Sequence, residues 1–346
     1  MPVMTDTALA KQLRTDIQRS GYYPDLVAEA LKEPALDAAE FEAARRELLA
    51  TLEQQKDDPN ALGSNALGRM VSQFAEEHPL GVPPHEKLIA GVSACKIEDV
   101  RAFHARFYGA QNAELAVVGD FDAATVKAAL ATAFGNSRLP APFSRVNREY
   151  RPVAATIGKI ATPDKENATF VARVAFPLQD KAADYPALVL ADFIVGGSAG
   201  ARLFQRVREK EGLSYDVFST LAVPTFSNSA SWTFGYIANP QNAAKAEAAL
   251  KDELQKLLAG NALTDEEFNA QRQSLLDQRL VRRSQDATLA AQLVTLADAD
   301  RTFTFVADLE GRIAKLTRAD FDTTMRKYLR LPELSSFVAG DFSKVK

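Results

Sequence analysis

Two stretches of this chain resemble each other and decide how its fold is interpreted: LDAAEFEAARRELL at 36–49 and LTDEEFNAQRQSLL at 263–276. Identical residues recur along both stretches at one constant offset, since 263 − 36 equals 276 − 49. They include Leu36, Glu40, Phe41, Arg45, Leu48 and Leu49 in the first, and Leu263, Glu267, Phe268, Arg272, Leu275 and Leu276 in the second. Apolar residues at helical spacing predict that both stretches are helices.

A second pair of matching segments lies further along, AELAVVGDF at 113–121 and LSSFVAGDF at 334–342. The offset here, 340 − 119, is only slightly shorter than that of the first pair. The shared residues are Val117, Gly119, Asp120 and Phe121, matched by Val338, Gly340, Asp341 and Phe342. Two matches in the same order at nearly the same spacing indicate that a whole unit has been duplicated.

The two copies differ in what precedes them. The second copy has over a hundred residues before Leu263, reaching back to a linker near Pro140, whereas the first has 35 residues before Leu36. We therefore expect that roughly 70 residues of the first copy are absent and that the chain is part of a longer protein.

Composition limits the kinds of partner and of structural feature that we expect. A hydrophobic content of 47% and a charged content of 25% are ordinary for a globular protein. The net charge of −4 gives no reason to expect nucleic acid or an anionic membrane as a partner, and no apolar run is long enough to span a bilayer. One cysteine excludes an internal disulfide framework.

Periodicity predicts an α+β fold. In the first copy we expect helices over 37–55, 60–77, 97–108 and 123–134, and one strand at 115–118. In the second copy we expect strands over 155–161, 168–176, 213–221, 230–237 and 336–339, separated by helices. Strands followed by runs of helices indicate helices on one face of a mainly antiparallel sheet.

The domain organisation follows from the repeat. We expect an incomplete, mostly helical unit at 1–137, a linker rich in Pro, Arg and Ser at 138–152, and a complete unit at 153–346. Thr264 with Glu267 predicts a capping box at the start of one helix of the complete unit.

The chain's three histidines do not form a metal motif. His85 precedes Glu86, but no second histidine follows at the helical spacing that a zinc-protease helix needs. We interpret His78, His85 and His104 as loop or surface residues, and we expect this chain to bind no metal itself.

The candidate nucleophiles also have ordinary interpretations. Cys95 precedes a predicted helix but has no recognisable base, so a buried structural cysteine is the preferred interpretation. Ser198 lies in GGSAG, which follows a helix-like segment rather than the strand of a nucleophile elbow. We interpret this loop as a tight connection between two helices, and we expect no catalytic residue in the chain.

The most distinctive string is ARLFQRVREKEGLSYDVFS at 201–219. Arg208 falls in the last turn of a predicted helix and Tyr215 on the strand after Gly212, a turn that can bring guanidinium and phenol together. From these residues alone, the simpler interpretation is preferred: Arg208 and Lys210 favour a helix C terminus, and Tyr215 packs in the sheet.

At this string the chain resembles the insulinase/pitrilysin family of zinc metallopeptidases. The motif R-x-x-E-G-L-S-Y, beginning at Arg208, is similar to the signature of the family's C-terminal half, which binds no zinc. The flanking GG-x-x-G-x-R-L-F, the PDKENATF stretch, and the F-E-x-x-R-x-x-L, DDP, HPLG and VVGDFD segments of the first copy also resemble the family. Both units are then expected to be insulinase-like.

The resemblance implies how the protein functions and which two of its residues bind the peptide. Family members pair two homologous halves around a chamber, and the N-terminal half binds zinc through H-x-x-E-H. The C-terminal half supplies an arginine and a tyrosine that grip the peptide, which by motif match are Arg208 and Tyr215. This match favours a substrate-binding role for Arg208 and Tyr215.

The departures from the family pattern concern zinc. H-x-x-E-H is absent, and alignment with the family's helix places Thr51 where the third zinc ligand would stand. Glu53 is two positions away and would face elsewhere on the helix. The resemblance therefore implies a non-catalytic part, with zinc held by the parent protein or by a partner.

Two functions are preferred from the sequence, and a third, an independent peptide-binding module, is disfavoured because the incomplete first copy should leave apolar surface exposed. The chain is either the C-terminal, non-catalytic part of a periplasmic or secreted zinc peptidase, or a non-catalytic subunit or scaffold paired with an active one. The implied partners are a peptide substrate and an N-terminal catalytic half or homologous catalytic subunit. Apolar surface left by the incomplete first copy also predicts self-association.

Overall fold

The computed structural model describes residues 23–346 except 73, 138–141, 147, 261, 344 and 346. By internal contacts the chain divides into two compact units, which are described separately. Unit 1 comprises 1–48 and 92–145, and unit 2 comprises 49–91 and 146–346. The division falls inside two helices, α3 (Ala38–Gln55) and α5 (His85–Ala94). Positions 138–141 and 147 of the predicted linker, and 1–22 of the predicted first unit, lie outside the described residues.

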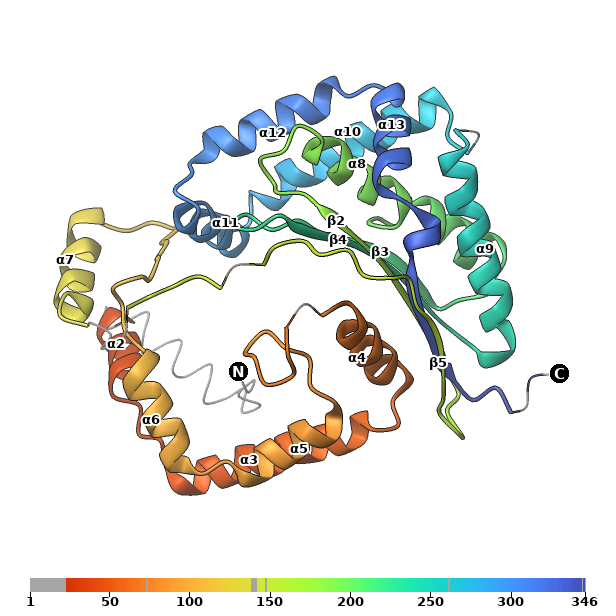
Figure 1. The fold of residues 1–346 in the computed structure, drawn as a ribbon. Coiled ribbons are helices and arrows are strands. Elements are labelled where there is room, and N and C mark those ends of the chain that lie inside the picture. The colour runs from red at the N-terminus through yellow and green to blue at the C-terminus, as the bar shows by residue number, and fades with distance from the viewer. Residues whose placement is uncertain are drawn as a thin grey trace. The chain divides into compact units, whose positions relative to one another are not determined.

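A five-stranded sheet forms the centre of unit 2, in the order β1-β5-β2-β4-β3 (Figure 1). β1 and β5 are parallel, and the other three pairs of neighbours are antiparallel. The predicted mainly antiparallel sheet is therefore confirmed. The strands are β1 (Ile157–Ala161), β2 (Ala168–Pro177), β3 (Asp216–Ala222), β4 (Ser229–Ala238) and β5 (Ser335–Gly340).

Helices cover one face of this sheet and enclose the main hydrophobic core (Figure 1). Successive strand residues point to opposite faces, so Phe170 and Phe176 of β2 and Trp232 and Phe234 of β4 enter this core at 0–1% exposure. The α+β prediction is confirmed. The elements are α8 (Tyr185–Val195), η1 (Phe204–Lys210), α9 (Pro240–Leu258), α10 (Asp265–Arg282), α11 (Asp286–Asp298), α12 (Phe303–Lys315), α13 (Arg318–Tyr328) and η2 (Leu331–Glu333).

The opposite face of the sheet carries a helix from the first copy, α4 (Pro59–Val71), which packs on β2 and β5 (Figure 1). Close approach is possible because α4 presents Gly63, where an added Cβ would lie 3.6 Å from Val171 Cγ2. Leu67 of the same helix is 1% exposed. The sheet is thus covered on both faces, whereas the sequence analysis predicted helices on one.

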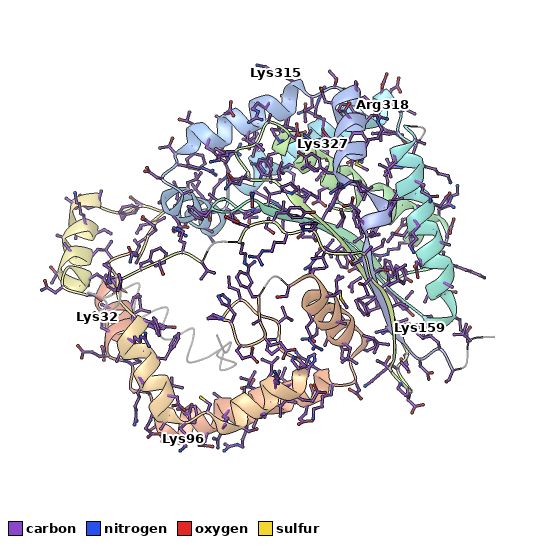
Figure 2. All side chains as sticks on the ribbon, in the orientation of Figure 1. Lys32, Lys96, Lys159, Lys315, Arg318 and Lys327 are labelled. Atoms are coloured by element: carbon purple, nitrogen blue, oxygen red, sulfur yellow. The ribbon has the colours of Figure 1, made fainter. Side chains whose placement is uncertain are left out.

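Unit 1 is helical and buries little apolar surface in its described part. It contains α2 (Tyr23–Lys32), the start of α3, α6 (Ile97–Phe107) and α7 (Ala123–Phe134). Lys32, labelled in Figure 2, donates from Nζ to the Ala133 carbonyl oxygen at 3.1 Å and ties α2 to α7. Phe103 and Phe107 of α6 have ring centres 4.9 Å apart but remain 56% and 45% exposed.

The helices of the two copies confirm the duplication. α3 and α10 begin and end at the same offset (265 − 38 equals 282 − 55), and α4 and α11 share it (286 − 59 equals 298 − 71). α6 and α13 keep the slightly shorter offset of the second pair of segments (318 − 97 equals 328 − 107). The predicted capping box of α10 is present, with Thr264 and Glu267 bonded reciprocally.

The strand predicted at 115–118 is absent, and this segment is extended without a sheet partner. Its counterpart β5 is a strand because β1 and β2 bond to it on both sides. The described part of unit 1 contains no strand to play that role. Without a neighbouring ladder the segment cannot form sheet hydrogen bonds, and Leu115 and Val117 remain 54% and 42% exposed.

Two helix predictions in the first copy also need correction. The helix predicted over 60–77 ends at Val71, because Ser72 Oγ exchanges hydrogen bonds with the backbone of Phe74 and turns the chain. α5, which begins at His85, lies in a stretch where no helix was predicted.

Candidate functional site

The string at 201–219 forms a helix, a turn and the start of an edge strand. The helix η1 has π geometry over Phe204–Lys210, a form associated with functional sites. Its buried Leu203 and Val207 anchor it to the core. Gly212 ends the helix with φ at 61°, a conformation that suits glycine, and its N–H donates to the Arg208 carbonyl oxygen at 3.0 Å.

Three arginines lie on or beside this helix, and two of them are held by ion pairs. Arg202 Nε lies 2.8 Å from Glu253 Oε1, whose side chain is 3% exposed. Arg206 Nε lies 2.8 Å from Glu211 Oε1 and also contacts Asp252. The contacts with Glu253 and Asp252 link this segment to α9, and both guanidinium groups already have carboxylate partners.

Arg208 differs from both. Its side chain is 47% exposed, and its only carboxylate contact among the described residues is Glu209 Oε1 at 3.8 Å. The guanidinium also lies 4.8 Å from the centre of the Phe204 ring. An exposed pair at this distance contributes little, so the guanidinium can bind another acceptor.

Tyr215 lies immediately before β3, the edge strand, and is 69% exposed. Its backbone N–H donates to the Ile237 carbonyl oxygen at 2.9 Å, and Ser214 Oγ donates to the same oxygen at 2.7 Å. The phenol lines an open depression with Glu166, Asn167 and Asn239. The simpler expectation that Tyr215 packs in the sheet is therefore wrong.

The structure brings Arg208 and Tyr215 to consecutive surface segments but shows no direct contact between them. Among the described residues, no hydrogen bond or cation–ring contact joins the two side chains. The role in substrate binding remains a prediction for both.

The glycine-rich loop before η1 is a connection between helices, as predicted. Gly196 lies against β3, where an added Cβ would be 2.4 Å from Ser219 N. Ser219 N in turn donates to the Gly196 carbonyl oxygen at 3.3 Å. Ser198 Oγ donates to the Phe193 carbonyl oxygen at 3.2 Å, the local bond of a loop hydroxyl.

Asp192, in the last turn of α8, ties this loop to the sheet. Its Oδ1 accepts hydrogen bonds from Ser219 Oγ at 2.6 Å and Trp232 Nε1 at 2.8 Å. Burial raises the pKa of the Asp192 carboxyl, although these two bonds oppose the shift. The carboxylate therefore supports the edge strand that follows Tyr215.

The three histidines lie on different elements, and two of them are on the surface or in a loop. His78 stacks on Phe74 at 4.3 Å between ring centres, and its Nδ1 accepts from the Leu80 N–H at 3.0 Å. His104, on α6, contacts the Leu31 carbonyl oxygen through Nε2 at 2.8 Å. His85 is 7% exposed at the start of α5, so its assignment to a loop or surface position is wrong.

The described residues offer no metal-binding cluster of His, Cys, Asp and Glu side chains. Thr51 is exposed on α3, and Glu53 forms an ion pair with Lys56 at 2.8 Å. Cys95 is partly exposed rather than buried, and its thiol contacts the Lys96 carbonyl oxygen at 3.8 Å. No described helix meets the length and hydropathy that a membrane span requires.

The sequence analysis assigned no role to the arginines of the predicted linker. Arg148 and Arg151 line a cavity of unit 2 together with Arg173 of β2. Their close spacing in sequence, beside prolines and tyrosine, was the available signal.

Comparisons with known proteins agree with this fold. An uncharacterized zinc protease of Mycobacterium leprae is 27% identical over 257 residues, covering 72% of this chain and 55% of that protein. The non-peptidase homolog YmxG of Helicobacter pylori is 21% identical over 321 residues, covering 92% of this chain and 72% of YmxG. The chain thus spans about half the length of the zinc proteases that it matches.

Solved structures match a larger share of the chain than the zinc proteases do. A crystal structure of a peptidase M16 inactive domain from Pseudomonas fluorescens superposes with a TM-score of 0.79 at 22% identity, over 95% of this chain and 77% of that one. The family model described as the peptidase M16 inactive domain matches residues 94–275, more than half of the chain. The resemblance to the non-zinc-binding portion of insulinase/pitrilysin peptidases is confirmed, and the chain belongs to the peptidase M16 inactive domain family.

Proposed function

We propose that this chain is the non-catalytic, C-terminal part of a zinc-dependent peptidase, where it forms one wall of the chamber that holds the peptide. In this role Arg208 and Tyr215 bind substrate. The observation that carries the proposal is a contrast among three neighbouring arginines: Arg202 and Arg206 each lie 2.8 Å from a carboxylate, whereas the Arg208 guanidinium is exposed and lies 3.8 Å from Glu209.

The chemistry of binding follows from these two side chains. A guanidinium donates several hydrogen bonds in a fixed plane and can hold a peptide carbonyl oxygen or a carboxylate. A phenol hydroxyl donates or accepts one more bond. Since Arg208 and Tyr215 come from segments joined by the Gly212 turn, a peptide lying along the β3 end could contact both.

Zinc does not fit the donors that this chain presents. The histidines come from a loop and from two different helices, and Thr51 supplies no carboxylate where the family places one. The zinc and the water that it activates then belong to the catalytic half of the assembly. The residues of this chain bind and orient the peptide there.

The test uses the assembly that contains the H-x-x-E-H half, with peptide turnover and zinc content as readouts. Arg208→Ala should lower kcat/KM by roughly 10- to 100-fold, the loss expected for a charged hydrogen bond, while zinc content is unchanged. Lys210→Ala, an exposed cation in the same turn, is the matched control and should have little effect. Equal turnover by Arg208→Ala and wild type would refute the assigned role.

A second function is favoured by one comparison. The match to YmxG, which is named a non-peptidase homolog, covers 92% of this chain. The chain would then act as a non-catalytic subunit or scaffold for a separate active peptidase. Co-expression with a homologous H-x-x-E-H protein distinguishes the two: a stable complex of two chains supports the subunit, and a reading frame joined to the catalytic motif supports the first function.

A further inference from the structure

A cavity of about 430 Å³ lies in unit 2 on the face of the sheet that α4 covers. Its floor is formed by β2, β4 and β5, and its walls by the end of α4, four residues of the following loop (Ser72, Phe74, Leu80 and Val82) and the segment at 148–155. The volume falls in the range of pockets for small organic ligands, about 300–1,000 Å³. Nothing in the proposed peptide-binding role of Arg208 and Tyr215 uses this cavity, which has separate lining residues.

The charge of the lining is strongly asymmetric. Four arginines, Arg148, Arg151, Arg173 and Arg330, face one carboxylate, Glu333. Glu333 is already paired, since its Oε2 lies 2.8 Å from Arg330 Nη2. The described polar contact of the Arg173 guanidinium is with a hydroxyl, Thr233 Oγ1, and not with a carboxylate.

Arg173 is the most informative of the four. It stands in the middle of β2, two residues from Val171, and therefore faces the α4 side of the sheet rather than the hydrophobic core. Its one described hydrogen bond runs from Nε to Thr233 Oγ1 at 2.9 Å, which leaves both terminal nitrogens for another acceptor. Burial lowers the pKa of the Arg173 guanidinium, a sign that its charge has lost part of its hydration.

A half-buried cation without an anionic partner is costly to maintain. A ligand carboxylate would remove that cost, because its two oxygens match the planar fork of a guanidinium. Ser231 and Ser335 add hydroxyl groups to the same floor. The polar side of the cavity is therefore suited to a carboxylate.

Apolar side chains also line the cavity. They come from α4, the following loop and the segment after Arg151: Val71, Phe74, Leu80, Val82 and Val153. The centre of the Phe74 ring is also 5.8 Å from the Arg148 guanidinium carbon, so apolar and charged side chains of the lining are neighbours. A ligand that contacts both kinds of side chain carries a carboxylate on an apolar body.

We propose that this cavity binds the α-carboxylate of an apolar residue, with the carboxylate on Arg173 and the side chain against Val71 and Leu80. Such a group occurs at the C terminus of a peptide or in a small acylated amino acid. The proposal does not depend on Arg208, because it concerns binding at a different site.

The experiment is calorimetric titration of the full chain with acetyl-Ala-Leu, acetyl-Ala-Leu-amide and acetyl-Leu. The free acid should bind and the amide should bind at least 10-fold more weakly, because amidation removes the negative charge. Tighter binding of acetyl-Ala-Leu than of acetyl-Leu identifies a peptide C terminus as the source. Equal binding of the two identifies a small acid of the same chemistry.

Two variants make the assignment specific. Arg173→Gln should weaken binding of acetyl-Ala-Leu by roughly 10- to 100-fold. Arg326→Gln, at an exposed arginine of α13 outside the cavity, should leave it unchanged. If Arg173→Gln fails to fold by circular dichroism, Arg151→Gln at the rim replaces it. Equal affinity for acid and amide, no binding of the acid, or competition by inorganic phosphate at equal concentration would each overturn the proposal.

Discussion

Arg45 donates a hydrogen bond from Nη1 to the carbonyl oxygen of Cys95 at 3.1 Å, and the same bond recurs in the second copy. There Arg272 Nη1 donates to the carbonyl oxygen of Leu316. Donor and acceptor keep the offsets of the matching segments around them, since 272 − 45 equals 263 − 36 and 316 − 95 equals 340 − 119. Each guanidinium also lies over a matching phenylalanine ring, at 5.6 and 5.5 Å. The duplication therefore preserves an individual long-range contact, which a chance resemblance of two helices would not do.

The same repeat allows a matched test of burial. Leu275 is 5% exposed in the core of unit 2, whereas its counterpart Leu48 is 47% exposed. We expect Leu275→Ala to lower the free energy of unfolding by about 2–5 kcal/mol, because it removes buried methyl groups and leaves a cavity. Leu48→Ala should cost less than about 1 kcal/mol. Urea unfolding followed by far-UV circular dichroism measures both, and equal losses would contradict the exposure difference.

A glycine pair tests the turn between Arg208 and Tyr215. Gly212 has a φ of 61°, so Gly212→Ala should destabilise the chain by about 1–2 kcal/mol. In the catalytic assembly it should also reduce peptide turnover, if this turn positions the two side chains. Gly311→Ala is the control: Gly311 lies inside α12 with open space at its Cβ, so alanine should stabilise by about 1 kcal/mol. Thermal unfolding should show a lower Tm for Gly212→Ala and a higher Tm for Gly311→Ala. A shift of Tm in the same direction for both variants would refute this explanation.

The carboxylate of Asp184 predicts a pH dependence of stability. Its Oδ2 accepts from Lys327 Nζ at 2.5 Å and Tyr328 OH at 2.6 Å, and Lys327 is labelled on α13 in Figure 2. The Lys327 bond, followed by the Tyr328 bond, holds the pKa of the Asp184 carboxyl below its usual 3.8. A lowered folded-state pKa stabilises the protein above the unfolded-state pKa, and the contribution is lost as pH falls through the folded-state value.

Asp184→Asn should therefore be less stable than wild type at neutral pH, and the difference should shrink as pH falls below about 4. Urea midpoints of both proteins across this range provide the measurement. Asp308→Asn, at an exposed carboxylate 3.5 Å from Arg312, is the control and should show a smaller change. A difference between Asp184→Asn and wild type that grows in acid would have the wrong sign for this mechanism.

Zinc content tests directly the proposal that the catalytic half, and not this chain, binds the metal. We expect the purified chain to contain far less than one zinc ion per molecule and to show no chelator-sensitive peptide cleavage. The reason is that the three histidines lie on separate elements, and that His78 and His104 already contact neighbouring backbone groups. Elemental analysis with a peptide assay, with and without chelator, is the measurement. Stoichiometric zinc would point to a ligand set that includes His78, His85 or His104.

The sequence predicted the helices of the second copy and the segment that carries Arg208 and Tyr215 because their signals are local. The Thr264 capping box, Gly212 after η1 and the apolar period of α10 each act within a few residues of the element that they define. The repeat could be found in the same way, since both copies keep the same residues at the same positions along α3 and α10.

Tertiary structure alone decided the features that need partners far apart in sequence. The segment at 115–118 has the composition of a strand, but a strand exists only where a neighbour completes its hydrogen-bond ladder, as β1 and β2 do for β5. Arg173 and the linker arginines meet because the α4 side of the sheet brings β2 and the segment at 148–155 around one cavity. Sequence thus determined the elements and the repeat, while long-range packing determined which strand could form and which charges came together.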